Sequence, residues 1–98
     1  MQINKSKDGA KLTLALGGRL DTTTAPELEA VVSSELDGVQ SLTIDLADLD
    51  YISSAGLRVL LSTQKTMNKQ GEMTVINCNE EIMEIFEVTG FSDILTIR

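Results

Sequence analysis

The sequence predicts a small α/β domain in which a mixed, mostly parallel β-sheet packs against about three helices. The spacing of apolar residues switches several times between about two, typical of strands, and about 3.6, typical of helices. Strands that alternate with helices favour parallel pairing through right-handed crossovers. A chain of 98 residues lies near the lower end of the usual domain size, so one domain spanning 1–98 is expected.

An antiparallel hairpin is expected at the N-terminus, on one side of this sheet. The segments MQINKSK and KLTLALGG flank Asp8-Gly9, a dipeptide that favours a tight turn. Leu12, Leu14 and Leu16 alternate with polar or small residues, which predicts a strand with one buried face.

A helix is predicted over residues 24–36, TAPELEAVVSSEL. Thr24 and Glu27 have the spacing of a capping box, and Pro26 lies in the first turn, where proline is tolerated. Its apolar stripe consists of Leu28, Val31, Val32 and Leu36.

A strand over residues 41–46, SLTIDL, and a second helix follow. The helix begins at the corner SSAG, residues 53–56, carries Leu57, Leu60 and Leu61 on one face, and ends at Gly71. Asp48 and Asp50 are predicted to lie solvated in the loop before this corner.

The remaining elements are a strand over 73–76, a helix that Asn79 caps and that ends before Gly90, and a last short strand over 93–97. If the three later strands are parallel, their carboxyl ends gather at one edge of the sheet, where such sheets usually place working residues. The predicted core includes Leu14, Leu28, Val32, Ile44, Leu57, Leu61, Val75 and Phe86.

Composition excludes several classes of function. The chain has no histidine, so it cannot assemble a Ser/His/Asp triad, and we expect neither an enzyme nor catalytic residues. Eight basic residues against 15 acidic ones leave a net charge of −7, the wrong sign for nucleic acid. No apolar run reaches the roughly 18 residues of a membrane span, and no signal peptide is visible, which predicts a cytoplasmic protein without membrane association. No metal or cofactor is predicted.

The SSAG corner has a consistent register if Ser53 is the N-cap. Ile52 and Leu57 then have the spacing of a hydrophobic staple, and the Ser53 hydroxyl is predicted to accept from a first-turn amide. Ser54 becomes the first helical residue with an uncommitted hydroxyl. Ala55 and Gly56 are small, so a bulky group could approach Ser54, and the helix amides would stabilise a phosphate there. Simple capping and a functional serine both remain open at this point.

Two segments together resemble the STAS domain family, in particular the bacterial anti-sigma factor antagonists. They are DLDYISSAGLRVLL and, about thirty residues earlier, GGRLDTTTAPEL, and the resemblance spans nearly the whole chain. The family's Gly-x-Leu-Asp corresponds to residues 18–21, and its Asp-Ser-Ser/Thr-Gly-Leu corresponds to residues 53–57. The resemblance places Ser54 on the phosphoacceptor. Ser53 stands where the antagonists usually have Asp, and Ala55 where they have Ser or Thr.

The resemblance implies a regulatory switch. The unphosphorylated antagonist binds an anti-sigma factor, commonly a serine kinase, and frees the sigma factor; a separate serine phosphatase reverses the mark. Asp21, Thr22 and Thr23 either form part of the partner surface or only build the turn between strand and helix. The alternatives are a STAS scaffold or ligand-binding module that is never phosphorylated, and an all-helical acyl or peptidyl carrier protein.

Overall fold

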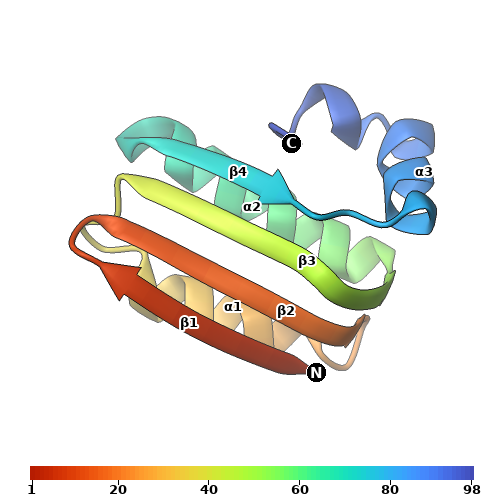
Figure 1. The fold of residues 1–98 in the computed structure, drawn as a ribbon, viewed down its shortest axis with the longest axis horizontal. Coiled ribbons are helices and arrows are strands. Elements are labelled where there is room, and N and C mark those ends of the chain that lie inside the picture. The colour runs from red at the N-terminus through yellow and green to blue at the C-terminus, as the bar shows by residue number, and fades with distance from the viewer.

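The computed structural model describes all 98 residues and contains a four-stranded sheet of order β1-β2-β3-β4 (Figure 1). β1 pairs with β2 in antiparallel fashion and the other pairs are parallel, so the predicted mixed sheet is confirmed. The chain is therefore not an all-helical carrier protein. Its elements are β1 (Gln2–Asp8), β2 (Lys11–Leu20), α1 (Ala25–Glu35), β3 (Ser41–Ile52), α2 (Ser54–Gln70), β4 (Glu72–Ile76), α3 (Glu80–Thr89) and the 3₁₀ turn η1 (Phe91–Asp93).

The N-terminal hairpin forms as expected, with its turn one residue later than the dipeptide indicated. Asp8 pairs with Lys11, so the loop residues are Gly9 and Ala10. Gly9 has a φ of 61°, a left-handed conformation that glycine adopts at little cost.

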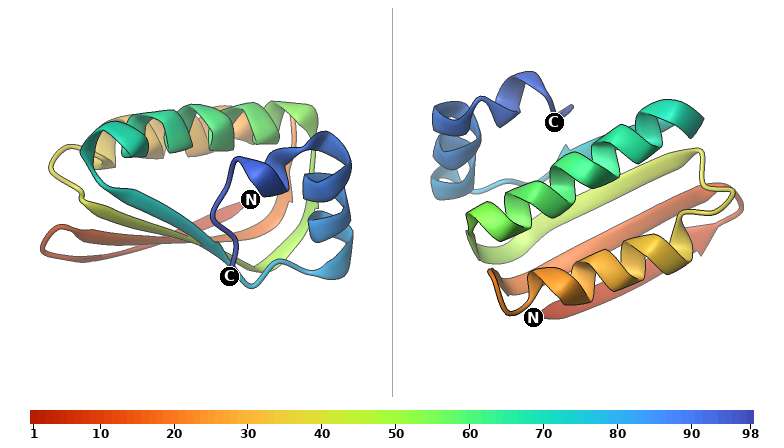
Figure 2. Two further views of the ribbon diagram at one scale, coloured as in Figure 1. Left: turned by 90° about the horizontal axis from the view of Figure 1, so that it is seen from above. Right: turned by 180° about the vertical axis from the view of Figure 1, so that it is seen from behind.

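The two longer helices lie side by side on one face of the sheet, and the opposite face carries no helix (Figure 2). α3 and the C-terminal segment stand at one end of the molecule, beyond β4 (Figure 1). The core lies between sheet and helices and is built from alternate residues of the inner strands, which are at most 1% exposed: Leu12, Leu14, Leu16, Leu42, Ile44 and Leu46. None of the helices has both the length and the apolar composition needed to cross a bilayer.

Six of the eight predicted core residues are buried, but Val32 and Leu61 are only partly buried. On α2, Val59 and Leu60 are 6% and 1% exposed, whereas Leu61 keeps more of its surface. The predicted face is wrong because α2 lies beside α1 as well as over the sheet. This second neighbour extends the buried face of α2 toward Val59 and Thr63, on the side away from Leu61.

β3 is longer than predicted, because the sequence from Asp48 onwards belongs to the strand rather than to a loop. Asp48 and Asp50 lie in β3 with exposed side chains. The β2–β3 register shifts twice, between Ala15 and Gly17 and between Gly18 and Arg19. Such irregularities bend paired strands and break the strict alternation of apolar residues that periodicity relies on.

The predicted last strand over 93–97 is wrong. Gly90 ends α3 in the left-handed conformation and the chain then turns through η1. Only Ile97 bridges to Val75, through hydrogen bonds from Val75 N to the Thr96 carbonyl (2.8 Å) and from Arg98 N to the Val75 carbonyl (2.9 Å). The apolar residues of this segment therefore serve to seal the edge of β4 rather than to extend the sheet.

Candidate functional site

The candidate site lies where β2 and β3 end side by side. Leu20 pairs with Ile52, and Ser53 N donates to the Leu20 carbonyl at 2.9 Å. The segment that follows β2 and the segment that follows β3 are thereby held together. Asp21, Thr22 and Thr23 accordingly lie at the same edge of the sheet as Ser54.

Ser54 is the first residue of α2 and its side chain is exposed. Its hydroxyl makes no hydrogen bond to another group of the protein, unlike the hydroxyls of Thr63 and Thr66 further along the helix, which donate to backbone carbonyls one turn back. The position predicted for Ser54, first in the helix and uncommitted, is the one observed.

Ser53 occupies the N-cap position in extended conformation, but its hydroxyl does not cap the helix. The Ser53 Oγ atom is buried and has no hydrogen-bond partner, so the predicted capping bond is wrong. The main chain holds the corner instead, through Ser53 N to Leu20 O and Leu57 N to Ser53 O, the latter at 2.9 Å. Ile52 and Leu57, the two residues of the predicted staple, are 2% and 7% exposed.

The missing capping bond leaves the start of α2 with free donors. The first amides of a helix have no intrahelical acceptor, and no side chain accepts from those at the start of α2. Together with the helix dipole, such donors favour an anion at this point. A phosphate ester on Ser54 would lie in their immediate reach.

Gly56 has a different role from the one the sequence suggested. It is buried, and a Cβ built on it would lie 2.6 Å from Leu20 Cγ and 3.0 Å from Ile52 Cγ1. Its small size therefore allows α2 to approach the ends of β2 and β3, and it opens no space for a visiting group. The expectation that Gly56 gives access to Ser54 is wrong; Ala55, which is partly exposed, does border open space.

Asp21 organises the turn between β2 and α1. Its Oδ1 atom accepts from the Thr23 amide (3.0 Å), the Thr24 amide (3.1 Å) and the Thr23 hydroxyl (2.8 Å). The hydrogen bond from the Thr23 hydroxyl, followed by those from the two amides, lowers the pKa of Asp21 to about 2. Asp21 and Thr23 thus build the turn, and Thr22 and Thr23 are both exposed, so a part in the partner surface stays a prediction for these residues.

The predicted capping box at the start of α1 is also wrong. Thr24 is the N-cap but has helical φ and ψ angles and no capping bond. Its hydroxyl accepts from Asp21 N at 2.8 Å and donates to the Arg19 carbonyl at 2.7 Å. Pro26 has no N–H to offer a cap, and Glu27 N donates to the Thr24 carbonyl at 2.9 Å rather than to its hydroxyl. The Thr24 hydroxyl instead ties the turn back to the end of β2.

Arg19 and Tyr51 form an exposed pair at this edge that the sequence did not reveal. The guanidinium lies 4.3 Å from the centroid of the Tyr51 ring, and Arg19 Nε lies 3.6 Å from Asp21 Oδ2. The two residues are direct partners across β2 and β3. Only the register could show this, because they are 32 positions apart (51 − 19) in the sequence.

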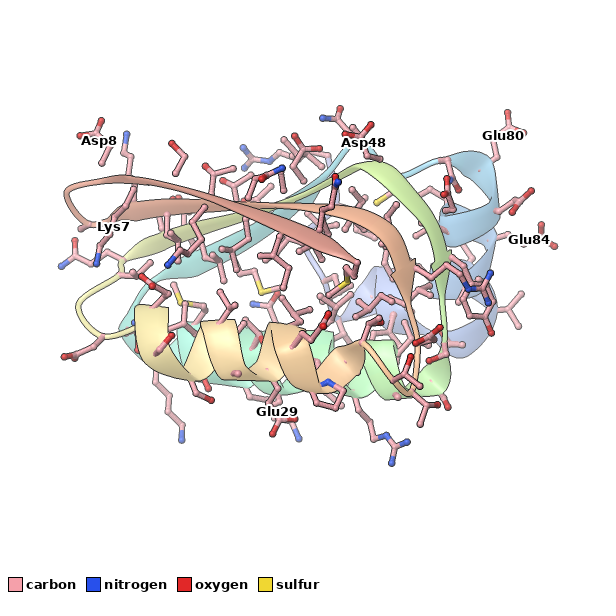
Figure 3. All side chains as sticks on the ribbon, turned by 90° about the horizontal axis from the view of Figure 1, so that it is seen from below. Lys7, Asp8, Glu29, Asp48, Glu80 and Glu84 are labelled. Carbon is pink, nitrogen blue, oxygen red and sulfur yellow. The ribbon has the colours of Figure 1, made fainter.

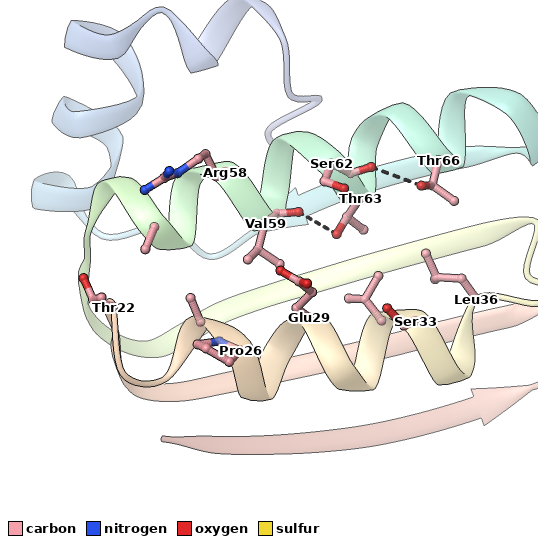
Figure 4. Close-up of a pocket in the computed structure, with 13 residues that line it drawn as sticks. Thr22, Pro26, Glu29, Ser33, Leu36, Arg58, Val59, Ser62, Thr63 and Thr66 are labelled. Atoms are coloured by element: carbon pink, nitrogen blue, oxygen red, sulfur yellow. Dashed lines mark hydrogen bonds between the residues drawn. The ribbon is translucent and has the colours of Figure 1, made fainter.

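An open groove of about 620 Å³ runs between α1 and α2 and begins at this edge (Figure 4). Thr22 and Ala55 line its near end, and Leu36 and Thr66 lie further along the two helices. Five of its thirteen lining residues are hydrophobic, and most of the others carry hydroxyl groups.

Arg58 is the one basic residue in this groove, and sequence reasoning missed it. The available signal was its spacing: Arg58 follows Ser54 by four positions, which places both residues on one face of a helix. Glu29, which lines the groove from α1, carries no such signal because it is remote from Ser54 in the sequence.

The fold and the sequence together define the class of protein: the chain belongs to the STAS domain family, whose pattern matches residues 2–98. It is 35% identical to the anti-sigma factor antagonist candidate BtrV of Bordetella bronchiseptica, over 99% of this chain and 85% of that protein. It is 32% identical to the anti-sigma-B factor antagonist of Staphylococcus aureus, over 85% of this chain and 79% of that protein.

Solved structures share this fold. An anti-sigma factor antagonist from Mycobacterium paratuberculosis superposes with a TM-score of 0.88 at 22% identity, over 98% of this chain and 83% of that one. SpoIIAA of Bacillus in its phosphorylated form superposes with a TM-score of 0.78 at 15% identity, over 99% of this chain and 91% of that one. At these identities the likeness concerns the fold.

Proposed function

We propose that this protein is an anti-sigma factor antagonist whose binding state is switched by phosphorylation of Ser54. In the unphosphorylated state it binds an anti-sigma factor that is also a serine kinase, and so releases the sigma factor. A phosphatase restores the binding state. The protein itself is a binding module of the cytoplasm and carries no catalytic group.

The observation that carries this proposal is the exposed, unbonded Ser54 hydroxyl at the uncapped start of α2. The 35% identity to BtrV and the 32% identity to the S. aureus antagonist support the choice of partner class. Kinase access to Ser54 needs no rearrangement of the fold, because the residue is already at the surface.

A phosphate on Ser54 would act locally. It adds about −1.5 to −2 charges to a chain whose net charge is −7, and the free first-turn amides can hold it without refolding. The cost falls on the partner contact, where the phosphate has to be desolvated or faces other negative groups. Affinity for the partner should therefore fall while the stability of the fold is retained.

The test uses an anti-sigma factor kinase from the source organism, purified and mixed with the protein and ATP. Phosphopeptide mass spectrometry should find the label on Ser54, and the Ser54→Ala variant should stay unlabelled while it still binds the partner in calorimetry. Affinity should fall at least about tenfold on phosphorylation. Label on Ser53, or equal binding of both states, would contradict the proposal.

A further inference from the structure

The two helices that flank the groove carry opposite charges. α1 contains the acidic residues Glu27, Glu29 and Glu35 and no basic residue. α2 contains the basic residues Arg58, Lys65 and Lys69 and no acidic residue. Of these charged residues only Glu29 and Arg58 line the groove, so in a protein of net charge −7 its α1 wall carries one negative side chain and its α2 wall one positive side chain.

The charges nearest the groove are not used inside the protein. The only ion pairs are Lys5 with Glu35, at 2.7 Å, and Arg19 with Asp21. Glu29 and Arg58 both line the groove, both are exposed, and neither has an ionic partner. Figure 4 shows Glu29 reaching from α1 toward α2, with Arg58 on the opposite helix. No group of this protein neutralises the charges of Glu29 and Arg58, so both are free to pair with charges of a bound partner.

The length of the groove suits a helix. Along the 11 residues of α1 it extends about 16 Å, which is the length of about three helical turns. Ala25, Val32, Ala55 and Val59 present small apolar groups to its interior. A helix that enters such a groove places an apolar stripe inside and its polar edges against the two walls.

Arg58 also connects the groove to Ser54. Residues at positions i and i+4 of a helix are neighbours on its surface, and long side chains lean toward the helix N-terminus. Figure 4 shows the Arg58 side chain extended toward the end of α2 where Thr22 lies, which is the end that begins with Ser54. A phosphate on Ser54 would therefore lie within reach of the guanidinium.

We propose that the α1/α2 groove seats an amphipathic helix of the partner, with its basic edge against α1 and its acidic edge against Arg58, and that a phosphate on Ser54 withdraws Arg58 from this contact. This inference rests on the proposed function for the identity of the partner. Phosphorylation then changes the mouth of the groove from mixed charge to negative charge only. The partner's acidic edge loses its counter-charge and meets a phosphate instead.

The first test blocks the groove sterically. The probe is a stapled helical peptide of about 12 residues with alanine and leucine on one face, lysine along one edge and glutamate along the other, titrated to about 1 mM. Amide signals of residues that line the groove should shift, and Ser33→Trp should weaken binding at least tenfold. The matched change Ser34→Trp adds the same ring to an exposed neighbour outside the groove and should have no effect.

The second test asks whether Arg58 holds the phosphate. With phosphoserine installed at position 54 during translation, ³¹P NMR reports the second pKa of the phosphate, ordinarily about 6. Arg58→Gln should raise this pKa by about 0.2–0.4 units, the contribution of an exposed i,i+4 pair. Lys65→Gln removes the same charge 11 positions from Ser54 and should leave the pKa unchanged.

The outcomes separate this inference from the proposed function. Absent groove shifts at the highest peptide concentration, equal effects of Ser33→Trp and Ser34→Trp, or equal phosphate pKa values in both charge variants would each overturn it. If the anti-sigma factor binds Ser33→Trp as tightly as Ser34→Trp, the groove is not its seat, while the switch at Ser54 stands. If the peptide binds and no anti-sigma factor does, the proposed function is at fault.

Discussion

At the scale of single residues, the two adjacent serines of the SSAG corner differ in environment. Ser53 is held by its backbone and buries a hydroxyl that bonds to nothing, whereas Ser54 exposes its hydroxyl to solvent. A buried polar atom without a partner lowers stability, and a free exposed hydroxyl costs nothing. Ser53 therefore serves the structure through its backbone, whereas the Ser54 side chain is accessible to modification.

Ser53→Ala should leave the free energy of unfolding within about 0.5 kcal/mol of wild type, because no capping bond is lost and an unsatisfied hydroxyl is removed. Asn79→Ala is the control, since the Asn79 side chain does accept from Ile82 N at 2.8 Å; it should cost about 0.5–2 kcal/mol. Urea denaturation measures both. A loss above about 1 kcal/mol for Ser53→Ala would show that its hydroxyl is bonded in solution.

Asp21 should make stability depend on pH. Its pKa is lowered from 3.8 to about 2 in the folded protein, so the carboxylate stabilises the fold above the unfolded pKa, and this contribution disappears as the pH falls through about 2. Asp21→Asn should therefore lower the urea midpoint at pH 7, and its difference from wild type should shrink between about pH 4 and about pH 2.

The matched control for Asp21 is Asp50→Asn, which removes an exposed carboxylate that accepts no hydrogen bond. Its urea midpoint should follow wild type throughout the same series. A constant difference between Asp21→Asn and wild type from pH 7 to about pH 2 would show that the carboxylate charge does not stabilise the turn.

At the scale of elements, α2 is positioned by two neighbours, the sheet and α1. Leu60 is 1% exposed and Leu61 is partly exposed, although the two leucines are adjacent and chemically identical. Leu60→Ala should cost about 2–5 kcal/mol of unfolding free energy, whereas Leu61→Ala should cost about 1 kcal/mol or less. Denaturant melts decide the matter, and equal losses would mean that the helix is rotated from the orientation described.

Gly56 determines how closely α2 approaches the strand ends. In an exposed helix Gly→Ala is favourable by about 1 kcal/mol, but at this position the new methyl group meets Leu20 and Ile52. Gly56→Ala should therefore destabilise the protein by about 1–3 kcal/mol. The double variant Gly56→Ala with Leu20→Ala provides the check, because removal of the Leu20 side chain should relieve the clash and make the combined loss smaller than the sum of the two single losses. Additive losses in thermal melts would show that the new methyl group does not clash with Leu20.

At the scale of the whole molecule, helices cover only one of the two faces of the sheet. α1 and α2 cover one face of the sheet, and α3, whose Glu80 and Glu84 project outward, stands at the end of the molecule (Figures 2 and 3). Nothing but the C-terminal segment covers the outer edge of β4. The C-terminal segment contacts β4 through a single β-bridge, so its attachment to the rest of the protein depends on the buried side chain of Leu95, which is 5% exposed.

Leu95→Ala should cost about 2–5 kcal/mol and should increase hydrogen exchange at the Val75 amide, which bonds to the Thr96 carbonyl. Ile94→Ala removes a neighbouring aliphatic side chain that is 45% exposed and should change both quantities little. Unchanged protection of Val75 in Leu95→Ala would mean that the segment closes the edge without its buried leucine.

Much of this architecture is predictable from the chain itself. The hairpin, the three helices, the inner strands and their mixed pairing depend on apolar period and turn residues, which are properties of neighbouring positions. The same local reasoning identified Ser53 as the N-cap position and Ser54 as the first, exposed residue of α2. It also identified the family, because the two matching segments are contiguous stretches of sequence.

Tertiary structure decided what depends on contacts between distant segments. Ser53 N donates to the Leu20 carbonyl across the ends of β2 and β3, and the Ser53 hydroxyl is buried there without a partner, an environment that no local pattern shows. β3 extends to Ile52 because it stays paired with β2 as far as Leu20. The predicted last strand is lost because the chain turns through η1 and then makes only one bridge to β4. The oppositely charged walls of the groove exist only because α1 and α2 lie side by side, a relation that no local pattern contains.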